Sequence, residues 1–227
     1  MDWLQNSGGH QTSDFRPQPS NEVSGIILAG GKGKRLGTPK ALIEIGGESL
    51  ILRTHRLLKS LFSEVLVVSG NSGFIPDIPE ATIVADEVAG IGPIGGLITG
   101  LRNIKGERAF CVACDMPFLD IDLIQHLISL SDSRDAVVPC AGRQIEPLHA
   151  VYSRTCLEVA QERIKRRQYS LTGLILSLNA EYVHIPFGPR ALSFFNINTL
   201  QDLALAERVY AQTERRPENY PLPQVLQ

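Results

Sequence analysis

Short apolar runs alternate with segments of helical periodicity along most of this chain, and this alternation restricts the fold more than any other feature. We expect strands at Gly25–Ala29, Glu64–Ser69, Ala109–Ala113, Ala136–Pro139 and Pro147–Tyr152. We expect helices at Ser49–Leu61, Pro93–Ile104, Asp120–Ser129, Arg154–Arg166 and Leu200–Gln212, with an ambiguous stretch between the last two. Alternating strands and helices form parallel sheets, and strands that are apolar throughout are covered on both faces. The sequence therefore predicts a single-domain α/β fold, a mostly parallel, Rossmann-like three-layer sandwich.

Both ends of the chain depart from this pattern. Residues 1–22 are rich in Gly, Pro, Ser, Gln and Asn, a mixture that cannot pack a core. Three prolines, Pro217, Pro221 and Pro223, interrupt the last residues. We expect a disordered extension over 1–22, one folded domain over 23–213 and an irregular tail over 214–227. A chain of 227 residues is long enough for one such domain.

Charge and hydropathy exclude two classes of partner. The formal net charge is −2 and the sequence pI is about 6.2, so a general polyanion-binding protein is not expected and nucleic acid is not a predicted partner. No apolar stretch approaches the roughly 20 residues that span a bilayer. Met1–Asn21 also lacks the apolar centre of a signal peptide. We therefore expect a cytoplasmic protein that does not enter a membrane.

The segment Leu28–Lys40 combines closely spaced glycines with four cations, directly after the first expected strand. Glycine lets backbone N–H groups approach phosphate, and Lys and Arg neutralise its charge. A solvated basic turn is the alternative, but it would not require Gly30 and Gly31 next to a buried strand. The spacing fits neither the P-loop nor the Rossmann fingerprint. The segment therefore predicts a polyphosphate loop of a different kind.

The loops that follow the expected strands begin at Gly30, Gly70, Asp86 and Cys114. Ligands of open parallel sheets bind beyond the carboxyl ends of the strands, so we look for a site at these four positions. Cys111 and Cys114 have the C-x-x-C spacing of zinc and redox sites. Residues three apart on a strand point to opposite faces, so we expect small core cysteines instead.

Five motifs in order give the chain a resemblance to a known group of enzymes. It is similar to the nucleotidyltransferases built around L-A-[GA]-G-x-[GS]-x-R-[ML]-G-x-x-K, and it most closely resembles the bacterial molybdenum cofactor guanylyltransferase family. The similarity extends over about 25–205. The matching residues are Leu28–Gly31 with Arg35–Gly37 and Lys40, Asp86 with Gly92–Leu97, Cys114–Leu119, Pro147–Tyr152 and Phe195–Thr199.

The resemblance implies a role for each residue of the predicted site. Backbone groups of Leu28, Ala29, Gly30 and Gly31 would line the nucleotide, Lys40 would reach its phosphates, and Asn71 and Asp86 would contact the base or ribose. Asp115 would hold Mg²⁺, a role that suits its chemistry because Mg²⁺ takes one or two carboxylates plus phosphate oxygens. The alternative for Asp115 is a helix N-cap ahead of Pro117.

The resemblance also implies a reaction. The terminal phosphate of molybdopterin would attack the α-phosphorus of GTP, with Arg35 and Lys40 stabilising the departing pyrophosphate. Proteins that deliver or receive the cofactor would be further partners. Many guanylyltransferases carry Asp where this chain has Pro39, which leaves open a cytidylyl or sugar-phosphate nucleotidyltransferase of the same fold. A non-catalytic nucleotide-binding regulator is the other alternative.

Several remaining polar residues carry weaker signals. His149 lies in an apolar stretch and is interpreted as a packed or pocket-lining histidine, whereas His55 and His126 are expected at surface or satisfied positions on helices. Asn196 and Asn198 alternate on one face of an expected strand. Their side chains either hydrogen-bond a turn of the backbone or contact the substrate, and the sequence does not favour one role over the other. The cations of Arg163–Arg167 form either a solvated helix face or a surface that attracts an anionic pterin.

Overall fold

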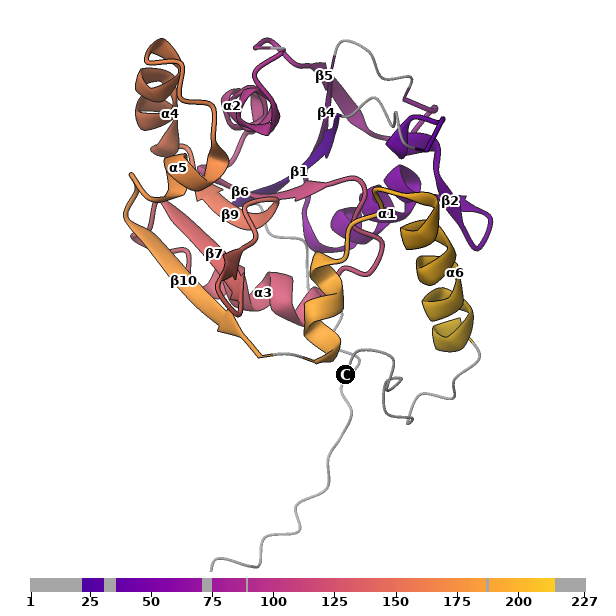
Figure 1. The fold of residues 1–227 in the computed structure, drawn as a ribbon. Coiled ribbons are helices and arrows are strands. Elements are labelled where there is room, and N and C mark those ends of the chain that lie inside the picture. Colours follow the sequence, from indigo (N-terminus) through magenta and orange to yellow (C-terminus); the bar gives the residue numbers. More distant parts are fainter. Residues whose placement is uncertain (1–21, 31–35, 71–74, 89, 187, 215–227) are drawn as a thin grey trace, which may run out of the picture.

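The computed structural model describes residues 22–30, 36–70, 75–88, 90–186 and 188–214, and this part of the chain forms one α/β unit (Figure 1). Its main sheet has eight strands, in the order β10-β7-β9-β6-β1-β4-β5, with β8 paired to β7. The strands are β1 (Val23–Ala29), β4 (Val65–Ser69), β5 (Thr82–Ala85), β6 (Arg108–Ala113), β7 (Ala136–Ala141), β8 (Gln144–Ile145), β9 (His149–Ser153) and β10 (Ala180–Ile185).

Most neighbouring strands of the sheet are parallel, as the sequence predicts. β1 pairs in parallel with both β4 and β6, and β10 pairs in parallel with β7. The exceptions are β9, which runs antiparallel to both β6 and β7, and the short β8, which runs antiparallel to β7. A parallel connection needs a crossover of about a dozen residues. Residues 142–148 are too few for one, so the chain turns back through the short β7–β8 hairpin and enters β9 in the opposite direction.

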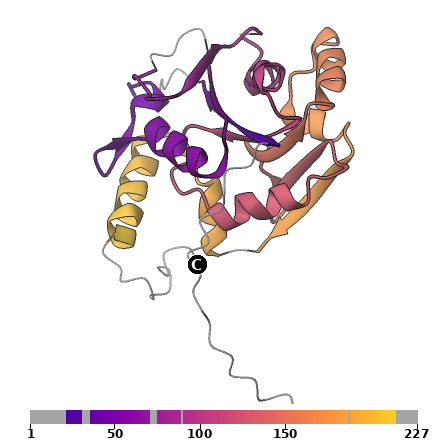
Figure 2. The same ribbon diagram turned by 180° about the vertical axis from the view of Figure 1, so that it is seen from behind.

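Helices cover both faces of the sheet, which confirms the three-layer sandwich. α1 (Leu50–Leu61) and α3 (Ile121–Ser129) lie on one face. The other face carries α2 (Pro93–Asn103), α4 (Cys156–Lys165) and α5 (Leu171–Ile175), as the view from behind also shows (Figure 2). Side chains of β1 alternate between these layers: Ile27 packs on the α1 side, and Ile26 and Leu28 pack on the α2 side. Each fully buried aliphatic side chain contributes roughly 1.5–3 kcal/mol.

The helix that the sequence places at Arg154–Arg166 begins two residues later, at Cys156. Arg154 is occupied in holding a loop instead. Its backbone N–H donates to the carbonyl of Glu107, and its guanidinium donates to the carbonyls of Ile104 and Gly106. The ambiguous stretch that follows α4 contains α5, β10 and the 3₁₀ helix η2 (Pro189–Phe194).

A third, smaller apolar cluster lies beside the main sheet. It joins the 3₁₀ turn η1 (Lys40–Leu42) and the hairpin of β2 (Glu44–Ile45) and β3 (Glu48–Ser49) to α6 (Leu200–Glu214). Its buried members are Ile43, Ile45, Leu50, Ile197 and Ala206. Tyr210 of α6 packs against Gly46, and the guanidinium of Arg53 lies 4.5 Å from the centroid of the tyrosine ring. This cluster brings the segment after β1 next to the segment before α6.

No helix of the described segments is long and apolar enough to cross a membrane. The predicted extension and tail fall almost entirely on residues 1–21 and 215–227, which lie outside the described residues.

Candidate functional site

A pocket of about 580 Å³ opens at the carboxyl ends of β1, β4, β5 and β6. Gly30, Gly70 and Asp86 line it, as the sequence predicts from the loops that follow these strands. The lining also includes Leu28, Lys40, Val68, Gly90, Gly92, Pro93, Gly96, Ala113, Asp115, Leu148, Asn196 and Asn198. The pocket therefore lies where an open parallel sheet holds its ligands.

The N-terminus of α2 forms one wall of this pocket. Gly92 precedes the helix with φ of 79°, a conformation that favours glycine, and Pro93 fills the first helical position. Gly96 lies so close to β1 that an added Cβ would be 3.1 Å from Leu28 Cδ2. Pro93 has no N–H and the Gly95 N–H donates to the Gly92 carbonyl, so it is chiefly the positive end of the helix dipole that suits a bound anion. This wall can receive a phosphate or another negatively charged group.

Lys40, Asp115 and Asn198 form a polar cluster in the same pocket. The Lys40 Nζ donates to Asp115 Oδ2 at 2.5 Å and to Asn198 Oδ1 at 2.6 Å. Lys40 comes from η1, Asp115 lies two residues after the end of β6, and Asn198 comes just before α6. The lysine and aspartate side chains are only 18% and 10% exposed, so their attraction is weakly screened by water. A single cation is thus held between two oxygens from distant parts of the chain.

Asp115 does not cap a helix. The N-cap of α3 is Asp120, whose side chain accepts from the backbone N–H of Leu123. Asp115 Oδ1 is buried and has no hydrogen-bond partner within the described residues. A buried carboxylate oxygen without a donor is costly. Oxygen is the ligand that a hard divalent cation prefers, so this atom fits a metal ion.

The structure places Asn198 in irregular backbone and not on a strand, so the expected strand at Asn196 and Asn198 is wrong. Asp202 holds this backbone, because its Oδ2 accepts from the N–H groups of Asn198 at 3.0 Å and Thr199 at 2.8 Å. These hydrogen bonds, the one from Asn198 first, lower the pKa of Asp202. Thr199 Oγ1 accepts in return from the Asp202 N–H. This reciprocal arrangement is a capping box, and it points Asn198 at the lysine.

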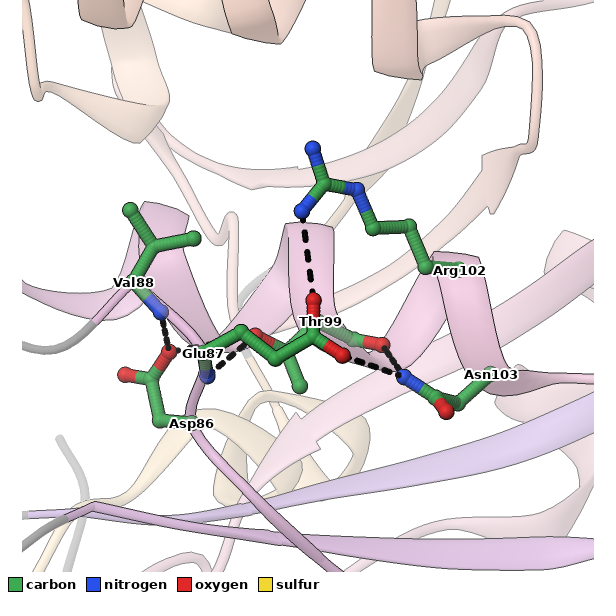
Figure 3. A network of polar contacts seen from close by, with 6 residues as sticks. All are labelled: Asp86, Glu87, Val88, Thr99, Arg102 and Asn103. Atoms are coloured by element: carbon green, nitrogen blue, oxygen red, sulfur yellow. Dashed lines mark hydrogen bonds and ion pairs between the residues drawn. The ribbon is translucent and has the colours of Figure 1, made fainter.

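Asp86 occupies the pocket wall between β5 and α2 (Figure 3). Its Oδ1 accepts from the N–H of Val88 at 2.9 Å and from the hydroxyl of Thr99 at 3.1 Å. The backbone N–H of Asp86 donates to the carbonyl of Ser69, at the end of β4. Hydrogen bonds therefore fix both the backbone and the side chain of Asp86.

Comparisons with known proteins identify the group to which this chain is related. A family model described as a MobA-like NTP transferase domain matches residues 25–179. The chain belongs to this family. A probable molybdenum cofactor guanylyltransferase of Pelotomaculum thermopropionicum is 34% identical over 86% of this chain and 96% of its own length. One from Thermococcus kodakarensis is 38% identical over 79% of this chain and 91% of its own length.

A solved structure gives the same assignment to the MobA-like family. The molybdopterin-guanine dinucleotide biosynthesis protein A of Archaeoglobus fulgidus superposes with a TM-score of 0.69 at 26% sequence identity. The match covers 83% of this chain and 99% of that protein. The resemblance drawn from the sequence motifs is therefore confirmed, together with a nucleotidyltransferase activity class.

Several predicted site residues of this MobA-like chain meet in the pocket, and others cannot be placed. Leu28, Gly30, Lys40, Asp86 and Asp115 all line it. The Ala29 side chain packs in the core on the α1 side of the sheet. Gly31, Arg35 and Asn71 lie outside the described residues. Their roles stay predictions.

The cysteines of this MobA-like chain behave as core residues, as expected. Cys111 packs on the α2 side of the sheet and Cys114 on the α1 side, so the pair does not share a ligand. Burial raises the pKa of the Cys111 thiol, and burial first of all raises that of Cys114 to about 12. Both side chains are therefore protonated hydrophobes and not reactive thiolates.

The histidine predictions have mixed outcomes. His149 is fully buried and lies edge-on to Phe110 and Phe194, which confirms a packed histidine. His126 is exposed on α3, as predicted. His55 was expected at a surface or satisfied position, and this is wrong. It is buried on the inner face of α1, and its Nε2 has no partner among the described atoms.

The cation run on α4 lies apart from the pocket lining. Lys165 and Arg166 are exposed and pair with Glu162, so they form the solvated helix face that the sequence favours. Arg163 differs, because its Nη1 donates to Ser177 Oγ at 3.1 Å and its Nε is buried.

Sequence reasoning missed two residues that build the site, Thr99 and Asp202, which orient the pocket carboxylate and amide described above. For Asn198, which was named, substrate contact and turn chemistry were both left open. Thr199 and Asp202 have the spacing of a capping box ahead of an apolar helix, so this signal was available in the sequence. Thr99 gives no such signal, since an interior helical threonine has no local motif.

Proposed function

We propose that this chain transfers the guanylyl group of GTP to the terminal phosphate of molybdopterin. A new P–O bond forms between the terminal phosphate oxygen and the α-phosphorus, the bond from the α-phosphorus to its bridging oxygen breaks, and pyrophosphate leaves. The product is the guanine dinucleotide form of the cofactor. The observation that carries the proposal is the Lys40–Asp115–Asn198 cluster facing the α2 N-terminus across one pocket. The names of the relatives support the choice of both substrates.

Lys40 is the residue that we expect to neutralise the triphosphate. Its ammonium is a compact charge on a flexible stem, so it can leave Asp115 and turn toward a phosphate oxygen while its backbone stays in η1. Asn198 Oδ1 lies 2.6 Å from the same Nζ and can guide this movement. Arg35 would add a second positive charge. Charge neutralisation and in-line positioning supply most of the rate enhancement in phosphoryl chemistry.

Asp115 is the residue that would hold Mg²⁺. Its Oδ1 is the buried oxygen without a hydrogen-bond donor, so a cation there would satisfy it. No group of three His, Cys, Asp or Glu side chains within the described residues could hold a metal ion, so phosphate oxygens would supply most of the remaining ligands. Bound Mg²⁺ supplies charge stabilisation to the reacting phosphates.

Asp86 and Asn71 would contact the base or the ribose. A carboxylate is an acceptor only, so Asp86 can accept from the N–H groups of guanine or from ribose hydroxyls. Backbone groups at Leu28–Gly31 would line the nucleotide beside them. No acid or base is needed for the attack, because a phosphate nucleophile is already ionised near neutral pH.

The test is incubation of the full chain with molybdopterin, Mg²⁺ and each of the four nucleoside triphosphates in turn. Product mass and released pyrophosphate are measured, and we expect both with GTP. A clear preference for CTP would assign the chain to the cytidylyl relatives. The same incubation is repeated with a sugar phosphate in place of molybdopterin. If only the sugar phosphate supports turnover, the acceptor is a sugar phosphate and not molybdopterin.

A pair of variants separates an enzyme from a nucleotide-binding regulator. Asp115→Asn should lower turnover by about 100-fold or more, the range seen when one preorganised charge-stabilising group is lost. GTP binding should be largely kept. The matched control is Asp132→Asn, because the Asp132 side chain is 94% exposed and lies outside the pocket lining. GTP binding without turnover in wild type would favour the regulator, and equal turnover of the two variants would contradict the role of Asp115.

A further inference from the structure

Thr99 is a buried polar residue beside the pocket with two well-defined hydrogen bonds. It lies in the interior of α2 and is fully inaccessible to solvent. Its hydroxyl donates to Asp86 Oδ1 at 3.1 Å and accepts from the Glu87 N–H at 3.0 Å (Figure 3). A helical threonine often donates to a carbonyl of its own helix. This hydroxyl instead leaves its helix to hold a neighbouring loop.

The hydroxyl determines which part of the Asp86 carboxylate remains available. Oδ1 also accepts from the N–H of Val88, so both hydrogen bonds of this carboxylate among the described residues end on the same oxygen. Each carboxylate oxygen has two acceptor positions. The two protein donors occupy those of Oδ1, and Oδ2 is left as the acceptor for a ligand in the pocket.

Close packing keeps the loop and the helix in register. An added Cβ at Gly95 would lie 2.5 Å from the Val88 carbonyl oxygen and 3.3 Å from Asp86 Oδ1. The loop therefore approaches α2 at a distance that only glycine allows. The carboxylate is thus confined on the Gly95 side, and the Thr99 hydroxyl is the side-chain donor that, with the Val88 N–H, holds its Oδ1 in place.

A second link between the loop and α2 is weaker. Glu87 pairs with Arg102 at 3.2 Å and accepts from Asn103 at 3.4 Å. The Glu87 and Arg102 side chains are 48% and 39% exposed, and exposed ion pairs contribute little because water screens them. The buried Thr99 hydroxyl is therefore the stronger determinant of where Asp86 lies.

We infer that Thr99 is a positioning residue for base recognition, acting through Asp86. Held in this way, Asp86 presents Oδ2 to the adjacent N–H groups on the Watson–Crick edge of guanine. Inosine keeps the ring N–H but lacks the 2-amino group, so it offers one donor fewer. The inference rests on the proposed function, since it assumes that the pocket holds the base of GTP.

The test compares equilibrium binding of GTP and ITP to the full chain in the presence of Mg²⁺. Thr99→Val has the same shape but lacks the hydroxyl, and we expect the preference for GTP over ITP to fall about tenfold, which corresponds to about 1.4 kcal/mol. Thr99→Ser keeps the hydroxyl and should restore the preference. Arg102→Gln removes only the exposed ion pair and should leave the preference unchanged.

Asp86→Asn separates failure of this inference from failure of the proposed function. If wild type binds GTP and ITP equally but binds both more tightly than CTP, the inference falls and the guanylyl assignment stands. If wild type binds CTP as tightly as GTP, the guanylyl assignment falls as well. If Asp86→Asn loses the preference and Thr99→Val keeps it, the inference alone is refuted. A uniform loss of affinity for both nucleotides in Thr99→Val also refutes it, because a purely structural role predicts that result. Should Thr99→Val fail to fold, Thr99→Ala, whose side chain has no donor, is measured instead, and an unchanged preference refutes the inference.

Discussion

The buried histidine His149 should make this protein sensitive to mild acid. Both ring nitrogens lack a hydrogen-bond partner within the described structure, and the ring lies 5.0 Å from that of Phe110 and 5.1 Å from that of Phe194. Burial lowers its pKa from 6.5 to about 3. The imidazole is therefore neutral in the folded chain at any pH at which the protein is handled.

The magnitude follows from the difference between the folded and unfolded pKa values. Because the folded pKa of His149 is the lower one, the unfolded chain binds the proton first, and stability falls as the pH drops below about 6.5. One pKa unit corresponds to about 1.36 kcal/mol, so the loss between pH 7 and pH 5 is about 2 kcal/mol. Further loss continues toward pH 3, where the folded chain also takes up the proton.

Urea unfolding at pH 5, 6, 7 and 8 measures this effect in wild type and in His149→Met. Methionine fills the same apolar space without a titrating group. We expect the free energy of unfolding of wild type to fall about 2 kcal/mol more than that of the variant between pH 7 and pH 5. His126→Met, which replaces an exposed histidine, serves as the control and should behave as wild type. Parallel pH profiles of wild type and His149→Met would refute the reasoning.

Three further substitutions have defined outcomes. Burial raises the pKa of Glu146 from 4.5 to about 7, so the unfolded chain loses the proton first and stability falls as the pH rises from about 4.5 to 7; Glu146→Gln should therefore increase the free energy of unfolding at pH 8 but not at pH 4. Gly46→Ala should cost about 2 kcal/mol or more in thermal unfolding, because φ is 61° and the new Cβ would meet the Tyr210 ring, whereas Gly47→Ala, with φ of 78° and open space, should cost less. Asp202→Ala should lower stability by about 1 kcal/mol and weaken GTP binding in a direct titration, and unchanged binding would show that the cap does not position Asn198.

The central strands of the fold could be predicted from the sequence, and the edges could not. β1 and β6 are covered by helices on both faces, so they read as continuous apolar runs. β5 and β10 are edge strands with exposed residues such as Ile83 and Tyr182. The apolar run of β5 is only three residues long, and that of β10 is interrupted by polar residues, so neither stands out in the sequence. The direction of β9 depends on the length of the connection before it and not on its own residues.

The candidate site was predictable where it follows a strand and not where distant segments meet. Asp115 lies two residues after the buried strand β6, so strand prediction leads to it, whereas Asp86 follows the edge strand β5 and is indicated by the motif resemblance. Asn198 reaches Lys40 from 158 positions away. Its approach depends on the third apolar cluster and on the Asp202 cap, and neither contact is encoded by local periodicity. Thr99 could not be identified because its partner, the Asp86 loop, becomes its neighbour only in the folded chain.

The third apolar cluster has a consequence for truncated and growing chains. The region matched by the family model ends at residue 179, so a fragment cut there would keep Lys40 and Asp115 but lose α6 and Asn198. During synthesis, the same polar group would be completed only after most of the polypeptide has left the ribosome. A ligand that needs the complete group could therefore stabilise the finished domain but not a nascent chain. Folding of the central sheet would have to proceed without help from its substrate.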